Sequence, residues 1–452
     1  MKNDLLAYVR NGQPLSYGKK LKLVATLSLP AIMAQLTSIM MQYIDASMVG
    51  RLGADAAASI GLVATTTWLF GSLSTSVSAG FSIQVAQYVG AKEYEKARRV
   101  LHNSYPVVLI VAAVLAAIGI GISRALPGWL GGTAEIQRDA TLYFRIYSLT
   151  LFAMALNSLA ASMLQCSGNM KIPGLLDSLM CVLDVVLNFL FIYVLKLGVL
   201  GAALGTALAV TVVTGLMLFF LWRRTPVLQR QRGEHYAYSG AYVKRAIRLS
   251  LPIAFEHLVV CGAMVAATRI VAPIGIIAIA ANSFAVTAES LCYMPGYGIA
   301  DAATTLVGQS VGAGRKELAW SFGRITVCSG MVLMAVMGGL MYLLAPILMS
   351  LLTENTAVCE LGVRVLRIEA FAEPLYGASI VCTGVMRGAG DTLVPSVMNF
   401  ISLWCVRLPL SYFLADRMGL EGIWLAMCAE LCFRGTVFLV RLVRRRWLRA
   451  VE

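Results

Sequence analysis

The segment LSLP at Leu27–Pro30 recurs as LSLP at Leu249–Pro252, 222 positions later in the chain. The same offset relates QYVGA at Gln87–Ala91 to QSVGA at Gln309–Ala313. An offset that persists over so long a stretch indicates an internal repeat, in which each copy forms one similar structural unit. Duplicated halves of this kind are a common build of membrane transporters.

The composition places both copies in a membrane. Of the 452 residues, 59% are hydrophobic and 13% are charged, and the mean hydropathy is +0.77. Soluble domains carry about 25% charged residues. Apolar stretches of about 20 residues, the length that crosses a bilayer as a helix, follow one another with short polar breaks. The sequence therefore predicts an all-α integral membrane protein.

The apolar stretches predict twelve transmembrane helices in two pseudo-symmetric six-helix lobes. Because six is even, both copies enter the membrane from the same side and form a parallel repeat. We expect an N-lobe at 1–222, a cytoplasmic linker at 223–246 and a C-lobe at 247–452. The predicted helices are 23–48, 56–82, 98–123, 138–164, 173–195, 199–222, 247–271, 278–306, 320–350, 357–386, 394–415 and 421–443.

The net charge of +14 reflects topology. Lys and Arg gather in alternate loops, which is the pattern of cytoplasmic loops in membrane proteins. This pattern predicts that both termini are cytoplasmic, in the plasma (bacterial inner) membrane, and that the partner of the basic loops is the lipid bilayer rather than a nucleic acid. We also expect a monomer, because two lobes already enclose one path.

Enzymatic chemistry has little support in the sequence. The ten cysteines are scattered without a CxxC motif, and His102, His235 and His257 are far apart. Neither a nucleophile–base arrangement nor a phosphate-binding loop is recognisable. The sequence predicts a protein that is not an enzyme, without catalytic residues, metal site or cofactor.

A polar face marks the first predicted helix. Gln35, Ser38, Gln42 and Asp45 are spaced three, four and three apart, which places them on one side of a helix. Such a face must contact protein or water. A carboxylate at bilayer depth costs about 2.5–3.5 kcal/mol, so an acid there is functional by default. Asp45 therefore has two interpretations, cation coupling or capping of the following turn.

Several motifs of the chain resemble those of the multidrug and toxic compound extrusion (MATE) transporters. They are PGYGIA at 295–300 with AATTLVGQSVGAG at 302–314, EP at 373–374 with MRGAGDT at 386–392, and Asp45 with VGRLG at 49–53. The resemblance covers residues 20 to 446. It implies an antiporter that expels organic compounds in exchange for protons or sodium ions.

The resemblance also implies a cation site in the N-lobe, at Asp45, Asp184, Asn188 and Thr206. Many MATE proteins have Asn first and Asp second on the fifth helix, whereas here Asp184 precedes Asn188. Two carboxylates in a low-dielectric pocket disfavour double ionisation, so the pair takes up a proton or holds sodium at Asp45 and Asp184. The alternative is a structural hydrogen-bonded pair of Asp184 and Asn188.

The C-lobe carries acids with two interpretations each. Glu256 and Glu289 attract organic cations or pair with Arg407 or Arg269. Glu373 precedes a proline, and either stabilises the helix kink there or faces the substrate cavity. With Gln35 and Gln42, these three glutamates are the predicted substrate path.

Two further features of the C-lobe bear on its role. Glu430 and Arg434 are four apart and predict a structural ion pair. Some MATE proteins carry a seventh-helix glutamate about two turns past the proline, and here that place, near Val260, is apolar.

The repeat is asymmetric in its acids. At the offset of 222, the N-lobe site residues Asp45, Asp184 and Asn188 map to Ala267, Val406 and Leu410. This asymmetry predicts that the N-lobe carries the coupling cation, while the C-lobe helps to form the substrate path.

The sequence favours a cation-coupled exporter of small organic, often cationic, molecules. The alternative is a flippase for lipid-linked oligosaccharides, a class that more often has a strongly basic central cavity. Only Arg407 and Arg434 lie deep in the predicted spans, against several acids. A membrane scaffold that does not transport would be expected to have no acids within its spans, whereas this sequence has several.

Overall fold

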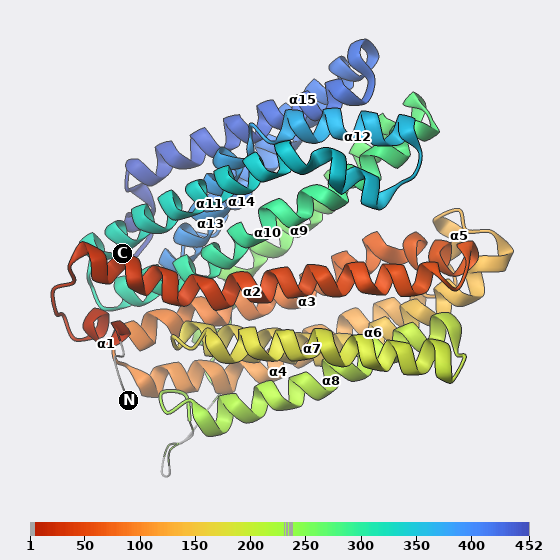
Figure 1. Cartoon of the computed structure of the whole chain (residues 1–452). Helices are drawn as coiled ribbons and strands as arrows, with labels where there is room; N and C mark the ends of the chain where they lie inside the picture. The colour runs from red at the N-terminus through yellow and green to blue at the C-terminus, as the bar shows by residue number, and fades with distance from the viewer. Residues whose placement is uncertain (1–4, 230, 232–233, 235–237, 452) are drawn as a thin grey trace. The chain divides into compact units, whose positions relative to one another are not determined.

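The computed structural model describes residues 5–229, 231, 234 and 238–451, and these residues are helical throughout with short connections (Figure 1). The first half contains α1 (Leu5–Arg10), α2 (Tyr17–Gly50), α3 (Ala54–Gly90), α4 (Tyr94–Ile122), α5 (Leu126–Trp129), α6 (Ala134–Cys166), α7 (Lys171–Phe189), the π-helix η1 (Leu190–Val194) and α8 (Gly198–Arg224). The second half contains α9 (Gly240–Val271), η2 (Ala272–Ile274), α10 (Ile276–Gly312), α11 (Lys316–Leu352), α12 (Thr356–Glu369), α13 (Glu373–Ala389), α14 (Leu393–Phe400), η3 (Ile401–Arg407), α15 (Leu408–Val443) and η4 (Arg446–Val451).

The predicted helical membrane fold is confirmed. Ten helical segments of the described chain are long and apolar enough to cross a membrane. The predicted tenth helix, 357–386, is two shorter helices, α12 and α13, on either side of a break. The last two predicted helices form one continuous segment, Leu393–Val443, whose path turns at Gly419 with φ 60° and ψ −137°. The ten segments do not include α12 and α13; counting this pair as one crossing, and the Leu393–Val443 segment as two, gives the twelve predicted crossings.

The chain forms two compact units. Unit 1 contains residues 1–35 and 255–452, and unit 2 contains residues 36–254. These divisions follow contacts in space, whereas the predicted lobes follow the sequence repeat. As a result, α2 begins in unit 1 and ends in unit 2, while α9 begins in unit 2 and ends in unit 1.

In unit 2, α6 lies against α3, α4 and α8, and α7 packs on α8 (Figure 1). The core between these helices is built from buried apolar side chains such as Phe81, Leu159, Met163 and Val213. Apolar area removed from solvent stabilises such a core by about 25 cal/mol per Å². The result is a bundle whose helices are fixed along most of their length.

Unit 1 repeats this arrangement with different elements. α10 packs against α11, α12 and α13, and α15 packs against α12 and α13. Its largest core contains Met349, Val365, Leu366, Trp424 and Leu431. The pair α12–α13 thus takes the place in unit 1 that α6 has in unit 2.

Glycines of neighbouring helices allow close approaches to α2 and α9, the two helices that are divided between the units and are called the shared helices below. A Cβ at Gly298 of α10 would lie 2.5 Å from the backbone nitrogen of Ile32 in the first half of α2. A Cβ at Gly80 of α3 would lie 2.3 Å from the carbonyl oxygen of Ala246 in the first half of α9. Both contacts are possible because glycine has no side chain.

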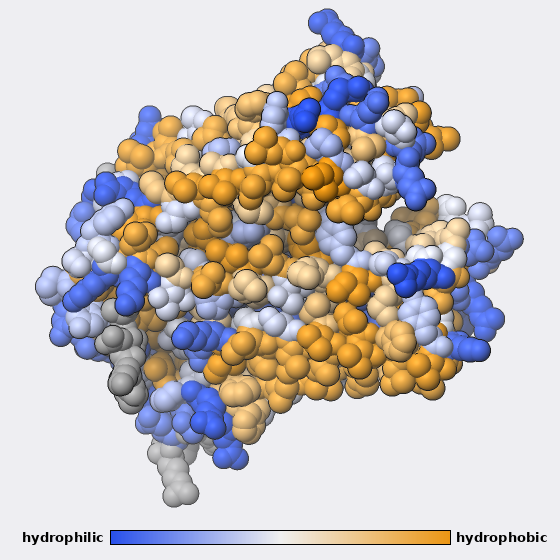
Figure 2. Space-filling view, in the orientation of Figure 1, coloured by the Kyte–Doolittle hydropathy of each residue, from blue (hydrophilic) through white to orange (hydrophobic). Residues whose placement is uncertain are grey.

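The surface agrees with a membrane location. Figure 2 shows apolar surface along the helices and hydrophilic surface gathered at their ends. Large apolar side chains such as Leu175, Val332, Leu343 and Val443 are more than 60% exposed. Apolar surface of this extent would be unfavourable in water and is expected where lipid covers it.

Candidate functional site

The predicted N-lobe residues meet within unit 2, around the amide of Asn188. Its Nδ2 atom donates hydrogen bonds to Asp45 Oδ1 at 2.9 Å and to Asp184 Oδ2 at 3.0 Å. Asn188 and Asp184 are fully buried on α7, whereas Asp45 is half-buried on α2. One amide therefore joins two carboxyl groups that are 139 positions apart in the chain.

The two carboxyl groups are neighbours, because both accept a hydrogen bond from the same amide nitrogen. Thr206 of α8 lies near Asp184. Two ionised carboxylates at this separation would repel each other strongly in a low-dielectric site. The geometry is therefore favourable when one positive charge, H⁺ or a metal cation, is present.

Unsatisfied acceptors mark the same place. Asp184 Oδ1 and Asn188 Oδ1 are buried and have no hydrogen-bonding partner among the described residues. A buried polar atom without a partner costs about 1–3 kcal/mol. Both atoms are oxygens, which suits a hard cation. The reversed order of Asp184 and Asn188 thus still gives a pocket with two acids and an amide.

Two neighbours of this site were missed by sequence analysis. Tyr143 of α6 lies near both Asp45 and Asp184. Gly205 of α8 lies directly against the Asn188 amide. The glycine-rich start of the sixth predicted helix was a signal for Gly205, because helices approach closely where side chains are absent. No spacing rule connects Tyr143 to the site, since it belongs to another helix.

The predicted substrate-path residues of α2, Gln35 and Gln42, belong to different units. Gln35 donates a hydrogen bond to Asp301 of α10, at 3.3 Å, within unit 1. Gln42 is exposed and belongs to unit 2. The face that carries Gln35, Ser38, Gln42 and Asp45 is therefore divided between the two units.

Glu256 of α9 is held in a polar network of unit 1. Its carboxylate accepts hydrogen bonds from Arg387 at 3.0 Å, Ser396 at 2.9 Å and Asn399 at 2.8 Å. For Glu256, the predicted pairing with Arg407 or Arg269 is wrong, because the arginine that reaches it is Arg387 of α13. With its charge matched and three donors bound, Glu256 fits a structural role.

Glu289, Glu373 and Glu430 lie deep in unit 1. The predicted ion pair of Glu430 and Arg434 is confirmed, with Arg434 Nε 3.0 Å from Glu430 Oε1. Glu289 is buried on α10, with Arg407 and Arg434 nearby. Glu373 is the first residue of α13, where the span is broken as predicted before Pro374.

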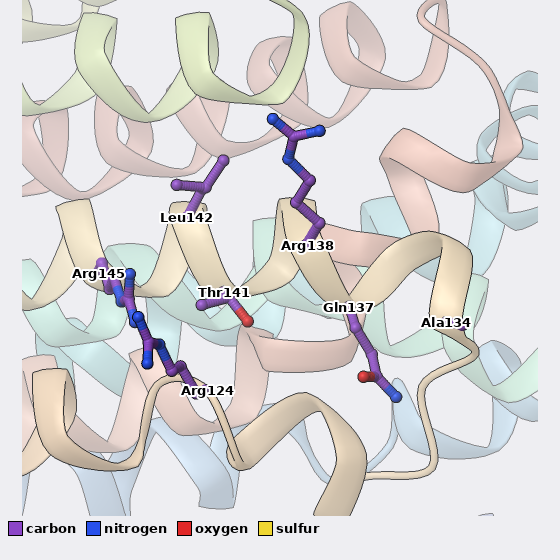
Figure 3. A pocket seen from close by; sticks show the side chains of 7 residues that line it. All are labelled: Arg124, Ala134, Gln137, Arg138, Thr141, Leu142 and Arg145. Atoms are coloured by element: carbon purple, nitrogen blue, oxygen red, sulfur yellow. The ribbon is translucent and has the colours of Figure 1, made fainter.

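A surface pocket of unit 2 differs in charge from all these sites. It has a volume of about 440 Å³ and lies between the end of α4 and the first turns of α6. Arg124, Arg138 and Arg145 line it, with no carboxylate among its lining residues (Figure 3). Because this lining is positive, the pocket is unsuited to an organic cation, and it contains none of the predicted site residues.

Comparison with known proteins relates the whole chain to one family. The family model described as MatE matches residues 30–190 and 252–413. The two matched segments begin at Pro30 and Pro252, the offset of the internal repeat. A probable multidrug resistance protein NorM of Thermotoga maritima is 25% identical over 433 residues, which cover 93% of this chain and 92% of that protein. A NorM protein of Pseudomonas aeruginosa is 28% identical over 436 residues, or 91% and 87% of the two chains.

Solved structures resemble the fold over nearly its full length. A crystal structure of MATE in complex with MaL6 superposes with a TM-score of 0.92 at 20% identity, covering 99% of this chain and 100% of that one. An outward-facing multidrug resistance MATE transporter has a TM-score of 0.91 at 20% identity, covering 96% and 97%. At these identities, the likeness establishes the arrangement of the helices.

Proposed function

Because the chain belongs to the MatE family and is a multi-pass membrane protein, we propose that it is a cation-coupled antiporter that exports organic, often cationic, molecules. The observation that carries this proposal is the Asn188 amide, which joins the carboxyl groups of Asp45 and Asp184. The multidrug resistance names of its NorM relatives agree with an export role. Export proceeds by alternating access.

The cation binds at Asp45 and Asp184, with Asn188 and Thr206 completing the site. Its uptake relieves the repulsion between the two carboxylates and satisfies buried oxygens. Asp45 lies on α2, which begins in unit 1 and ends in unit 2. A change in the packing of α2 therefore affects both units. Coupling follows if the substrate and the cation favour different packings of this helix.

The coupling ion is H⁺ or Na⁺, and the residues fit both. A proton on one carboxyl group removes the repulsion between the two. Sodium would use the carboxylate oxygens with the amide and hydroxyl oxygens of Asn188 and Thr206, which are hard ligands. No other cofactor enters the proposal, and the protein has no enzymatic role in it.

Gln42, Glu289 and Glu373 are the candidate contacts of the substrate, each within its own unit. Gln35 and Glu256 support the path rather than contact the substrate, because each is engaged by a protein partner. We further propose a monomer in the bacterial inner membrane with both termini cytoplasmic, since basic residues crowd the loops on that side.

The test is efflux of ethidium, an aromatic organic cation, from proteoliposomes under a proton gradient or a sodium gradient applied separately. Wild-type protein is expected to respond to one of the two gradients. Asp45→Asn is expected to remove this response, while Asp55→Asn, an exposed aspartate of the same unit, retains it. Gradient-driven efflux that is equal in wild type and Asp45→Asn would contradict the proposal.

A flippase for lipid-linked oligosaccharides is the alternative function. It is disfavoured because Arg434, one of the two arginines predicted to lie deep in the spans, is already paired with Glu430. A pyrophosphate headgroup needs positive charge that is not neutralised. Movement of a fluorescent pyrophosphate-linked lipid across liposomes, with no response of ethidium, would support this alternative instead.

A further inference from the structure

Around the break between α12 and α13, unit 1 contains four buried glutamates and only two nearby arginines. Glu369 and Glu373 are 0% exposed, Glu430 is 0% exposed and Glu289 is 6% exposed. The arginines near them are Arg407 and Arg434. With every group ionised, this part of the unit would hold two negative charges in excess. A buried charge without a partner costs several kcal/mol, so such a state is strongly disfavoured.

The two uncompensated negative charges would be those of Glu369 and Glu373. Arg434 is committed to Glu430 by their 3.0 Å contact, and Glu430 also accepts a hydrogen bond from Ser402. By contrast, all four carboxyl oxygens of Glu369 and Glu373 are buried and have no hydrogen-bonding partner among the described residues. These two side chains are therefore the groups that need a cation or a proton.

Residues of α10, α11, α13, η3 and α15 surround Glu369 and Glu373. From α11, Gly338 lies so close that a Cβ there would be 2.9 Å from Glu373 Cβ, so no side chain separates them. From α13, Tyr376 lies with its ring 5.4 Å from the Arg434 guanidinium. The titratable and charged groups facing them from α10, η3 and α15 are Glu289, Cys292, Arg407, Cys428, Glu430 and Arg434.

Helix ends distinguish the two carboxyl groups. Glu369 is the last residue of α12, and Glu373 is the first residue of α13 after the break at Ala370–Ala372. The C-terminal end of a helix carries partial negative charge and the N-terminal end partial positive charge. The ionised form is thus disfavoured at Glu369 and favoured at Glu373. Of the two, Glu369 is therefore the carboxyl group that is protonated first.

A proton fits this place better than a metal ion. Within the described part of the chain, no three carboxylate, thiol or imidazole side chains converge well enough to hold a metal. The nearby thiol of Cys292 is a weak donor and does not replace a cation. A proton needs no coordination shell and converts a buried charge into a neutral acid.

We propose that Glu369 and Glu373, at the break between α12 and α13, form a proton-binding site in unit 1 that is separate from the Asp45–Asp184 site. In the exchange step, the O–H bond of the Glu369 carboxyl breaks and H⁺ passes to water, leaving a carboxylate. The reverse step restores the neutral acid. The part of this inference that concerns transport rests on the proposed function, whereas proton binding itself does not.

The direct test is infrared spectroscopy of the purified full-length protein, which detects the carbonyl absorption of protonated carboxyl groups. A variant with both Asp45→Asn and Asp184→Asn removes the contribution of unit 2. Its remaining absorption is expected to decrease from acidic to alkaline pH. It should be lost in Glu369→Gln and retained in Glu369→Asp, which keeps the acid. Glu360→Gln, an exposed glutamate on the same helix, is the matched control and leaves the absorption unchanged.

Three results would overturn the inference. They are an absorption that is absent from the Asp45→Asn/Asp184→Asn variant, one that does not change with pH, or one that survives in Glu369→Gln/Glu373→Gln. If the glutamine variants do not fold, Glu369→Asp takes their place: the absorption is expected to shift in frequency when the glutamate becomes an aspartate, and an unshifted absorption would overturn the inference.

Proton release on ethidium binding, followed with a pH indicator in weak buffer, tests the transport part. Glu369→Gln is expected to release fewer protons per bound ethidium than wild type or Glu360→Gln. Equal release in Glu369→Gln, with a loss in Asp45→Asn, would contradict this inference and leave the proposed function intact. Equal release in all variants would contradict both.

Discussion

A Cβ atom built at Gly205 of α8 would lie 2.0 Å from Oδ1 of Asn188 on α7. The hydrogen bonds of the Asn188 nitrogen to the two carboxyl groups turn the amide oxygen toward Gly205, where the absence of a side chain leaves room for it. The closeness of α7 and α8 is thus part of the geometry of the candidate cation site.

Gly205→Ala is expected to displace Asn188 and to weaken cation-driven ethidium efflux. Overpacking of this kind costs about 1–3 kcal/mol. Gly215→Ala, on the same helix with no atom within 4 Å of its Cβ, is the matched control. Thermal unfolding and efflux measured together check the prediction, which fails if the two variants behave alike.

Asn188→Leu removes the donor that joins the two acids. Each hydrogen bond to a charged group contributes about 1.5–3 kcal/mol and stabilises the ionised carboxylate, so its loss makes protonation easier by about tenfold or more, whereas sodium loses the amide oxygen as a ligand. We expect the ion concentration needed for half-maximal efflux to fall by that factor if the coupling ion is H⁺ and to rise if it is Na⁺. Thr211→Val, an exposed position of α8, serves as the comparison, and an unchanged ion dependence in Asn188→Leu would refute the assignment.

Arg387→Ala is expected to lower the thermal unfolding temperature strongly. Its removal leaves the carboxylate of Glu256 buried without its charge partner, and breaking a buried pair costs about 3–5 kcal/mol. Arg387 is 26% exposed, so the lower end of this range applies. The control is Arg364→Ala, whose pair with Glu421 is exposed and contributes about 0–1 kcal/mol. Equal unfolding temperatures for the two variants would count against a structural role of Glu256.

Gly298→Val and Gly80→Val test the contacts of the shared helices. Either side chain would meet backbone atoms of α2 or α9 at less than 3 Å, which the helices must relieve by moving apart. Both variants are expected to unfold at lower temperature and to transport less. Gly339→Val and Gly121→Val, at positions with open space, control for valine in a helix. If all four variants unfold at the same temperature, the close approach has no importance for the fold.

The membrane fold could be predicted from the sequence because apolar length and the repeat are local signals. The approach of Asp184 and Asn188 followed from their spacing, and their meeting with Asp45 followed from the family resemblance. The ion pair of Glu430 and Arg434 was predictable for the same reason, since a separation of four residues fixes a shared helix face.

Contacts between distant helices were not predictable in this way. Glu256 pairs with Arg387, 131 positions away, and helix periodicity does not state which helices become neighbours. The residues at which α12 ends and α13 begins could not be predicted either. The proline at 374 indicated a break, but it did not show that Glu369 would end one helix and Glu373 begin the next.

The division of α2 and α9 between the units has a consequence for how the two copies depend on each other. Each repeat begins with a helix whose first half is built into the unit formed mainly by the other repeat. The two copies therefore exchange equivalent elements within one chain, as the subunits of a domain-swapped dimer do. A single copy would lack the helix segment that the other copy supplies, and the first half of its own first helix would have no partner to pack against.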